Sequence, residues 1–322
     1  MIKIGLLGGS GYVAGELLRI LLKHPKVNIS SVVSRSQLGV PVCNIHKDLA
    51  GESPIFFTDH LIDDIEVVFL CLGPNSSIDN LKSISYKTSI IDLSNDLRLL
   101  KYSSGRYFIY GLSELHRNSI KKARNITNPG CFSTAIQLAL IPLANMSLLK
   151  EDIHISAITG SSGGGRSSLN ENSNFSFRAN NISLYKIFTH QHIKEIYQTI
   201  RFLQRDFQQK IVFTPYKGNF TRGIFATIYI RSSISLMEIE EIYKNFYKYH
   251  PFTHLSENPI HIKQVVNTNK CLLHIDKENG FLIISSIIDN LLKGASGQAI
   301  QNLNLMYGFE ETSGLELKSL AI

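Results

Sequence analysis

The sequence predicts an α/β protein with two parts: an N-terminal domain built on a parallel sheet, and an α+β domain whose sheet is mostly antiparallel. Within residues 1–130, short apolar runs alternate with amphipathic stretches, which is typical of parallel strands joined by helices. After residue 150, strand-like runs follow one another with few helices between them, which is typical of antiparallel pairing. The length of 322 residues is enough for two domains and a large hydrophobic core.

The composition predicts a cytoplasmic globular protein. Hydrophobic residues make up 43% of the chain and charged residues 18%, both ordinary proportions. No apolar run approaches the roughly 18 residues that a membrane span needs, and the apolar start of the chain is too short for a signal peptide. The net charge of +7 comes from scattered basic residues, which argues against a nucleic-acid partner and suits anionic small molecules.

The cysteines lie far apart in the chain and show no C-x-x-C spacing; they are Cys43, Cys71, Cys131 and Cys271. This distribution argues against a disulfide framework and against a zinc ribbon. It fits a reducing compartment, in which one thiol can be catalytic.

The first element is a strand, Ile2–Leu7, and helical periodicity follows over Glu16–Leu22. Between them lies the turn Gly8-Gly9-Ser10-Gly11-Tyr12-Val13-Ala14-Gly15. Glycine lets the backbone turn tightly and approach a pyrophosphate, to which the helix start donates N–H groups. A strand, a glycine turn and a helix start therefore predict a Rossmann-type domain that binds a nicotinamide dinucleotide. The spacing Gly8-x-x-Gly11-x-x-Ala14 departs from G-x-G-x-x-G, and a plain strand-to-helix turn is the alternative.

The second strand, Val27–Val33, ends in the sequence Ser34-Arg35-Ser36. A carboxylate at this position would bind the ribose 2′-hydroxyl of NAD, whereas a cation between two hydroxyls suits the 2′-phosphate of NADP. The sequence therefore favours NADP, with a surface arginine as the alternative.

Two further buried strands are expected, Val67–Leu72 before Pro74 and Ser89–Leu93 before Arg98. Ligands gather at the carboxyl ends of parallel strands. Arg98 is the residue there that could hold a substrate carboxylate or phosphate, and an ordinary surface arginine is the alternative.

Cys131 follows the break Asn128-Pro129-Gly130 and precedes an apolar run, Ala135–Leu143, that predicts a helix. A thiol in the first turn of a helix meets unpaired N–H groups and the positive end of the macrodipole, and both favour the nucleophilic thiolate. The alternative is a small buried residue at the start of a packed helix.

The second domain begins with a strand, Ile153–Thr159, followed by a glycine-rich loop, Gly160–Arg166, and a polar segment, 167–181. A helix is expected over Leu236–Tyr249 and another near the end of the chain, up to about Tyr307. The remaining expected strands are Ile211–Thr214, Ile224–Ile230, Cys271–Ile275 and Phe281–Ile288.

His190-Gln191-His192 and Glu195 form the other dense chemical cluster. A cysteine nucleophile is usually partnered by an imidazole that a third group orients, and residues 192 and 195 would share one face of a helix. The third ligand that a metal needs is not spaced nearby, so we expect no metal site. A nicotinamide cofactor, a reactive thiol, a histidine and anion-binding arginines together suit thioester chemistry with hydride transfer. In that chemistry the thiolate attacks an acyl phosphate, and a histidine protonates the oxyanion formed on reduction.

Motifs in order along the whole chain make it resemble the N-acetyl-gamma-glutamyl-phosphate reductases of arginine biosynthesis. They are Gly8-Gly9-Ser10-Gly11-Tyr12, Asp92-Leu93-Ser94 with Arg98, Tyr110-Gly111-Leu112, Asn128-Pro129-Gly130-Cys131, Thr159-Gly160-Ser161-Ser162-Gly163, His190-Gln191-His192 with Glu195, Arg222-Gly223-Ile224 and Ile288-Asp289-Asn290-Leu291-Leu292-Lys293-Gly294-Ala295.

The resemblance implies NADP(H), with Cys131 as the nucleophile and His190 as the acid/base, and a small-molecule acyl phosphate as substrate. It implies a cofactor domain over 1–130 and 291–322, and a catalytic domain over 131–290 that carries homodimer or homotetramer contacts. The substrate-binding residues expected are Arg98, His192, Glu195 and Arg222. The cofactor-binding residues expected are Gly8, Ser10, Gly11, Tyr12, Val13, Ser34, Arg35, Ser36, Pro74, Ser161, Gly163, Asn290 and Lys293.

Three departures from the family pattern are Phe132-Ser133 in place of Tyr-Pro, Lys194 in place of Pro, and Ser113 in place of Pro. None of them is a proposed reacting residue. The alternatives are an acyl-phosphate reductase for a carrier-bound aminoadipyl group, the same reaction on an N-succinyl substrate, and a catalytically silent NADP-binding regulator.

Overall fold

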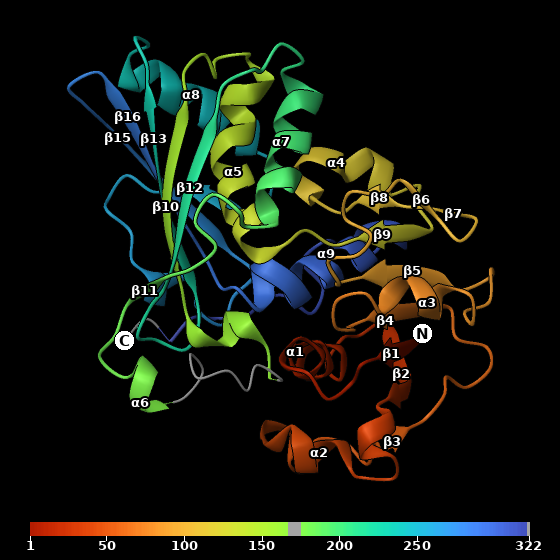
Figure 1. Cartoon of the computed structure of the whole chain (residues 1–322). Coiled ribbons are helices and arrows are strands. Elements are labelled where there is room, and N and C mark those ends of the chain that lie inside the picture. The colour runs from red at the N-terminus through yellow and green to blue at the C-terminus, as the bar shows by residue number, and fades with distance from the viewer. Residues whose placement is uncertain (167–174, 321–322) are drawn as a thin grey trace. The chain divides into compact units, whose positions relative to one another are not determined.

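A computed structural model describes residues 1–166 and 175–320. The chain forms two compact units (Figure 1). Unit 1 consists of Met1–Pro129, Gly165–Ser167 and Ala295–Glu316, and unit 2 of Gly130–Gly164, Ser168–Gly294 and Leu317–Ile322. The polar segment expected over 167–181 lies partly outside the described residues.

Unit 1 is built on a seven-stranded sheet with the order β3-β2-β1-β4-β5-β9-β8, and every neighbouring pair is parallel. Its strands are β1 (Ile2–Leu7), β2 (Val27–Val33), β3 (Phe57–Thr58), β4 (Val67–Leu70), β5 (Ser89–Asp92), β8 (Ile109–Tyr110) and β9 (Asn125–Thr127). A short hairpin of β6 (Tyr102–Ser103) and β7 (Arg106–Tyr107) stands apart. The order 3-2-1-4-5 is that of a doubly wound dinucleotide-binding sheet, so the predicted fold class is confirmed for this unit.

The helices of unit 1 are α1 (Tyr12–Leu21), α2 (Val42–Ile45), α3 (Ser77–Leu81), α4 (Ser113–Ile120) and α9 (Gly297–Met306). Helix α1 buries the apolar face that its 3.6-residue period creates, including Leu17, Leu18 and Leu21. It begins earlier than the expected Glu16, because the glycines of the turn hide the start of the helical period.

The last helix, α9, is tied into unit 1 by buried amide side chains. The Nε2 of Gln298 and the Nδ2 of Asn302 both donate to the carbonyl of Gly111, each at 2.9 Å. The Oδ1 of Asn304 lies 3.0 Å from the Nε2 of His24. All three amides are fully buried, so each depends on partners that are distant in sequence.

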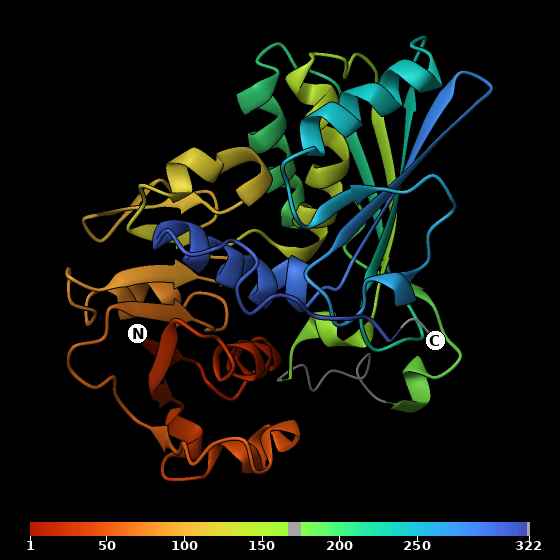
Figure 2. The ribbon, with the colours of Figure 1, turned by 180° about the vertical axis from the view of Figure 1, so that it is seen from behind.

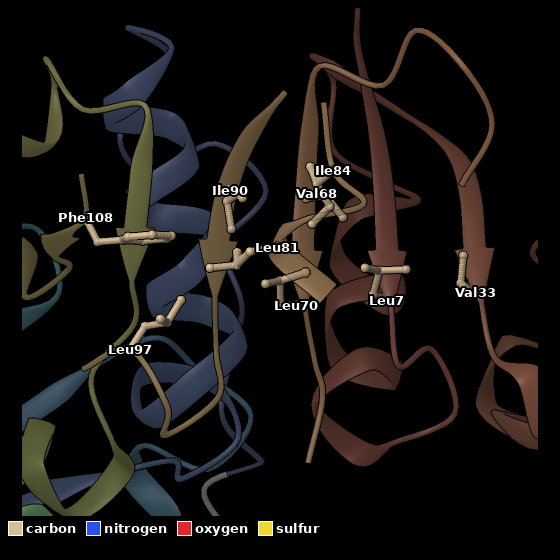
Figure 3. Packing of buried hydrophobic residues seen from close by; sticks show 9 residues of the cluster. All are labelled: Leu7, Val33, Val68, Leu70, Leu81, Ile84, Ile90, Leu97 and Phe108. Atoms are coloured by element: carbon tan, nitrogen blue, oxygen red, sulfur yellow. The ribbon is translucent and has the colours of Figure 1, made fainter. Parts of the chain in front are cut away.

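One part of the core of unit 1 runs across the sheet from β2 to the segments beside β5 (Figure 3). The side chains in this cluster are those of Leu7, Val33, Val68, Leu70, Leu81, Ile84, Ile90, Leu97 and Phe108. Leu97 and Phe108 come from loops, so the same apolar cluster that supports the strands also fixes the loop that carries Arg98.

Unit 2 is built on a second seven-stranded sheet with the order β11-β12-β10-β13-β16-β15-β14. Its strands are β10 (Ile153–Thr159), β11 (Ser183–Leu184), β12 (Ile211–Lys217), β13 (Ile224–Arg231), β14 (Thr253–Leu255), β15 (Cys271–Glu278) and β16 (Phe281–Ile288). The pairs β10–β12 and β14–β15 are parallel and the others antiparallel. The sheet is therefore mixed with mostly antiparallel pairs; the β10–β12 pair is parallel because helix α7 lies between these strands in the chain.

The helices of unit 2 are α5 (Cys131–Asn145), α6 (Phe175–Arg178), α7 (His192–Leu203) and α8 (Leu236–Tyr247). Helices α5, α7 and α8 pack together on one side of the sheet (Figure 2). Helix α5 is buried on all sides from Phe132 to Ala144, which explains its mostly apolar sequence. Pro142 has no N–H to donate to the carbonyl of Leu138, and the hydroxyl of Tyr247 donates to that carbonyl instead.

The opposite face of this sheet carries half-buried and exposed side chains from its central strands. They alternate with the buried residues beneath α5, as the two-residue period of a strand requires. In register across the sheet lie Thr214, Ser156, Thr227 and Ser285, with Tyr229 and Ile283 in the next row.

Candidate active site

The glycine turn after β1 leaves room at the start of α1. Gly8 has a φ of +85°, and a Cβ there would lie 2.5 Å from the carbonyl oxygen of Cys71, so only glycine fits. Gly11 is the N-cap of α1, and a Cβ there would meet only the carbonyl oxygen of Gly8, at 3.9 Å. Tyr12 is exposed and Val13 half-buried in the first helical turn. A tight turn followed by an open helix start fits the pyrophosphate of a dinucleotide.

Three serine hydroxyls link the end of β2 to this turn. The Oγ of Ser34 lies 3.2 Å from the Oγ of Ser10 and 3.5 Å from the Oγ of Ser36. Ser34 is buried, whereas Arg35 is exposed at the start of a short 3-10 helix. An exposed guanidinium beside linked hydroxyls can bind a phosphate monoester, as the 2′-phosphate of NADP requires.

The loops after β4 and β5 are held by the buried carboxylate of Asp92. Its Oδ1 accepts from the Oγ of Ser77 and its Oδ2 from the Oγ of Ser94, both at 2.8 Å. Burial raises the pKa of Asp92 to about 6, although these hydrogen bonds and the charge of Arg98 act against the rise. Pro74 is exposed in the first of these loops.

Arg98 is half-buried at the carboxyl ends of β5 and β9. Its Nε donates to the carbonyl of Asn128 at 3.0 Å, and its Nη1 and Nη2 donate to the Oδ1 of Asn95 and the carbonyl of Leu93, each at 3.3 Å. These contacts hold the guanidinium in place at the carboxyl ends of the two strands.

In unit 2, Cys131 is the first residue of α5, and Gly130 is its N-cap. The N–H of Gly130 donates to the Oε2 of Glu195 at 3.0 Å, and the N–H of Ser133 donates to the Nδ1 of His192 at 3.4 Å. The Nε2 of His192 lies 3.9 Å from the Oε1 of Glu195. Both side chains come from the first turn of α7 and are buried, so α7 fixes the backbone that carries the thiol.

His190 lies next to this group, in a largely aromatic environment. Its ring centroid is 4.5 Å from that of His192, 5.4 Å from that of Phe132 and 5.5 Å from that of Phe213. Its Nδ1 accepts from the N–H of His192 at 3.3 Å. That bond leaves Nε2 as the ring nitrogen for a mobile proton.

Tyr185 interacts with both the histidine and the cysteine, and no sequence pattern pointed to it. Its ring centroid lies 5.7 Å from that of His190. Burial raises the pKa of the Tyr185 hydroxyl, and interaction with Cys131 raises it further, so the phenol stays a neutral donor. A lone tyrosine before the histidine motif has no spacing that marks it, and its role emerges only when the chain is folded.

Arg222 lies at the start of β13 and forms an ion pair with the buried Asp289, with its Nη2 3.0 Å from the Oδ2. Asp289 also accepts from the backbone N–H groups of Asn267 and Leu291. The guanidinium is thereby fixed while about a fifth of the side chain, 21%, remains exposed. Such an arginine can still meet an anion.

The other expected cofactor residues of unit 2 lie around the end of β16. The Oδ1 of Asn290 accepts from the N–H of Gly223 at 2.7 Å, and its Nδ2 donates to the Oγ of Ser162 at 3.0 Å. Asn290 therefore ties two loops together. Gly163 is exposed and Ser161 half-buried, whereas Lys293 is fully buried with its Nζ 5.8 Å from the ring centre of Phe252.

Gly294 is a second residue whose role sequence reasoning missed. A Cβ at this position would lie 2.7 Å from the Cβ of Cys131, so only glycine lets this backbone pass the nucleophile.

Within the described part of the chain, no group of three or more His, Cys, Asp or Glu side chains is arranged to hold a metal ion. Among the described helices, none has the length and apolarity to cross a membrane.

Comparison with known proteins places this geometry in a family. Residues 3–123 match the NAD binding domain of the semialdehyde dehydrogenases, and residues 131–290 match their dimerisation domain. An N-acetyl-gamma-glutamyl-phosphate reductase of Karelsulcia muelleri is 56% identical over 326 residues, covering 100% of both chains. That of Flavobacterium johnsoniae is 52% identical over 322 residues, covering 99% of both. The chain belongs to the N-acetyl-gamma-glutamyl-phosphate reductase family.

Solved structures confirm the two-part semialdehyde dehydrogenase fold of this reductase family. An aspartate semialdehyde dehydrogenase II of Vibrio cholerae has a TM-score of 0.73 at 13% identity, covering 96% of this chain and 98% of its own. An aspartate semialdehyde dehydrogenase of Candida albicans, solved with NADP, has a TM-score of 0.68 at 14% identity, covering 95% and 98%. At this identity the likeness establishes the fold alone.

Proposed function

We propose that the protein catalyses the NADPH-dependent reduction of N-acetyl-gamma-glutamyl phosphate to N-acetylglutamate 5-semialdehyde and phosphate, a step of arginine biosynthesis. The observation that carries this proposal is the buried group of His190, His192 and Glu195 around the helix start at Cys131, in a chain of this reductase family. The names of the relatives do not favour a carrier-bound substrate or a silent regulator.

Cys131 supplies the nucleophile. The N–H groups in the first turn of α5 favour its thiolate and can stabilise negative charge on the substrate oxygen. The sulfur attacks the acyl carbon, a C–S bond forms, and the C–O bond to phosphate breaks with its electron pair on the phosphate oxygen. The enzyme then carries a thioester.

His190 carries the protons of this sequence. It takes the proton of the Cys131 thiol as the C–S bond forms and gives it to the departing phosphate oxygen. The neutral imidazole then takes a proton from solvent, passes it to the substrate oxygen once the thioester is reduced, and recovers it when the C–S bond breaks and the aldehyde leaves. His192 and Glu195 fix the backbone N–H groups of Ser133 and Gly130, so they orient the thiol and the acyl group; we propose that Arg98 and Arg222 bind the anionic groups of the substrate.

The residues around the glycine turn fit NADP(H). The open space at Gly11 admits a pyrophosphate, and Arg35 with the hydroxyls of Ser10, Ser34 and Ser36 suits a 2′-phosphate. We propose that Gly8, Tyr12, Val13 and Pro74 complete this surface, and that Ser161, Gly163, Asn290 and Lys293 also bind the cofactor. When bound, NADPH supplies the hydride that reduces the thioester.

We propose a cofactor domain over 1–130 and 291–322 and a catalytic domain over 131–290, a division that the compact units support. The chain carries the dimerisation domain of its family. We propose a homodimer or homotetramer that assembles through the face of the unit 2 sheet opposite α5, where Tyr229 and Ile283 lie. We propose a cytoplasmic location, because widely spaced cysteines without C-x-x-C pairs suit a reducing compartment.

The experiment runs the reaction backwards. The protein is mixed with N-acetylglutamate semialdehyde, phosphate and NADP, and NADPH is followed by absorbance. Cys131→Ser should lower the rate at least about a thousand-fold, and His190→Gln about a hundred-fold. The matched control is Cys43→Ser, a half-buried cysteine outside the site, which should retain the rate. The proposal fails if the protein forms no NADPH or if Cys131→Ser is fully active.

A further inference from the structure

Three cationic side chains of unit 2 gather at Tyr185, the residue whose ring contacts His190. Lys217 is the last residue of β12, and its Nζ lies 5.0 Å from the centre of the Tyr185 ring. Arg178 and Lys186 both act on Lys217 by charge repulsion. Lys217 is far from the other residues in sequence, and the antiparallel pairing of β11 with β12 brings it to them.

Two of these side chains are tied to neighbouring backbone and side-chain oxygens. The Nζ of Lys186 donates at 2.9 Å to the Oε1 of Gln191, the residue between the two active-site histidines. The Nη2 of Arg178 donates at 3.3 Å to the carbonyl of Gly218, directly after Lys217. Within the described residues, the partners of all three cations are neutral: an amide oxygen, a carbonyl oxygen and an aromatic ring.

This arrangement is unfavourable without an anion. Lys217 is half-buried, and burial lowers its pKa; the nearby charges of Arg178 and Lys186 lower the pKa further. Lys186 is exposed, and Arg178 and Lys217 are half-buried. Like charges held near one another repel, and an oxyanion placed among them would relieve that repulsion. The cluster therefore has the electrostatics of a binding site for an anion.

The backbone beside the cluster is strained in a way that fixes its shape. Lys186 has a φ of +47° and Phe188 a φ of +57°, both in the left-handed region that side chains other than glycine rarely occupy. Strain of this kind is kept where the surrounding structure needs one particular conformation, most often at functional sites. It positions Lys186 between Tyr185 and the His190 motif.

We propose that Arg178, Lys186 and Lys217 form an anion site that binds a carboxylate of the substrate, at the end remote from the acyl phosphate. This inference rests on the proposed reaction. The phosphate is bonded to the carbon that Cys131 attacks, so it must lie at the sulfur. The α-carboxylate lies about 5 Å farther along the carbon chain, and the centre of the Tyr185 ring lies 5.7 Å from the ring centroid of His190 and 5.0 Å from the Nζ of Lys217.

The test compares Lys217→Met, which keeps the aliphatic stem against the Tyr185 ring, with Lys217→Arg, which keeps the charge. Removal of one charge-assisted contact should raise the KM for the semialdehyde about ten-fold in Lys217→Met, while the KM values for phosphate and NADP and the kcat stay near those of the unchanged protein. Lys217→Arg should restore most of the affinity. The matched control is Lys210→Met, at the exposed opposite end of β12, which should leave every constant unchanged.

A second measurement does not depend on turnover. Calorimetric titration with N-acetylglutamate should give a Kd about ten-fold higher for Lys217→Met than for the unchanged protein or Lys210→Met. If Lys217→Met raises the Kd for this probe but the unchanged protein forms no NADPH, the anion site is supported and the proposed reaction is contradicted.

Two different carboxylates could occupy the site, and a change of substrate distinguishes them. If the site holds the α-carboxylate, Lys217→Met raises the KM for N-acetyl- and N-succinylglutamate semialdehyde equally. If it holds the carboxylate of the N-succinyl group, only the KM for the N-succinyl compound rises. A rise in the KM for phosphate with that for both semialdehydes unchanged overturns the proposal, as does a Lys217→Met variant whose constants for both the N-acetyl and the N-succinyl compound equal those of the unchanged protein.

Discussion

Arg35 is the residue on which the choice between NADP and NAD depends. Its exposed guanidinium stands beside the linked hydroxyls of Ser10, Ser34 and Ser36, and only NADP has a phosphate to place among them. Arg35→Ala should therefore raise the KM for NADP about ten- to a hundred-fold and leave the KM for NAD nearly unchanged. Steady-state kinetics with both cofactors measure the two effects. An equal rise in the KM for both cofactors would show that Arg35 does not bind the 2′-phosphate.

The sequence predicted the role of a single residue where the residue type fitted the helices, strands or turns predicted on either side of it. Cys131 could be proposed as a nucleophile because a Pro-Gly break and an apolar run mark a helix start around it. Tyr185 and Lys217 could not, because each becomes significant only through strand pairing and through contacts with residues distant in sequence. The roles assigned to the individual site residues stay predictions until the variants are measured.

The turn between β1 and α1 offers a matched pair of substitutions. Gly11→Ala should leave the melting temperature almost unchanged, because its Cβ meets nothing closer than 3.9 Å. It should still weaken NADP(H) binding roughly ten-fold, because the methyl group fills the space proposed for the pyrophosphate. Gly8→Ala should lower stability itself, since its φ is +85° and its Cβ would lie 2.5 Å from a carbonyl oxygen. Thermal melting measures the effect on stability, and NADPH titration measures the effect on cofactor binding. If Gly11→Ala binds NADPH as tightly as the unchanged protein, the pyrophosphate does not bind at Gly11.

The loops that Asp92 joins should respond to pH. Its pKa is raised from the ordinary 3.8 to about 6 by burial, so the native state holds this proton more tightly than the unfolded chain does. Between about pH 4 and 6 the native state therefore binds more protons, and the contribution of Asp92 to the unfolding free energy falls as pH rises, by on the order of 3 kcal/mol in total.

Asp92→Asn removes this titration. The unfolding free energy of the unchanged protein minus that of Asp92→Asn should fall as pH rises through this window, which urea denaturation at several pH values measures. Ser94→Ala is a useful comparison, because it removes one hydrogen bond to the carboxylate but keeps the titrating group. Parallel stability curves for the unchanged protein and Asp92→Asn would contradict the prediction.

Strands were predicted with the right bounds where the apolar period agreed with turn residues at both ends of the run. The strands Ile2–Leu7, Val27–Val33 and Ile153–Thr159 have the predicted bounds, because each is a short β-branched run with turn residues at its ends. The helical period of α1 is visible only from Glu16, several residues after the helix begins at Tyr12. The apolar run of α5 likewise begins at Ala135, but the Pro-Gly break correctly placed Cys131 in the first turn of this helix.

At the scale of the whole molecule, self-association should depend on the uncovered face of the unit 2 sheet. Ile283→Glu places a charge in the middle of that face and should shift the protein toward monomers, because burying an unpaired carboxylate is strongly unfavourable. Met237→Glu is the control: it lies on α8 and is 80% exposed. Sedimentation velocity measures both. A monomer produced by Met237→Glu and not by Ile283→Glu would place the interface on the helical side.

The sequence predicted the parallel sheet of unit 1 and the mostly antiparallel sheet of unit 2, and it could not predict the strand orders. Alternating strands and helices predict parallel pairing, because a crossover returns each strand to the same direction. Which strands become neighbours depends on contacts between distant segments, such as β10 with β12 and β13 with β16. The parallel pairs of unit 2 were missed for this reason.

The buried amides of α9 have a consequence for the order in which the chain matures. During synthesis the carbonyl of Gly111 and the imidazole of His24 emerge long before Gln298, Asn302 and Asn304, their later partners. The polar groups of unit 1 therefore stay open to water while the part of unit 2 that ends at Gly294 is translated and free to fold. We expect a nascent chain arrested before residue 295 to hold a folded second unit and a protease-sensitive first one, so that the cofactor turn is among the last parts of the molecule to become rigid.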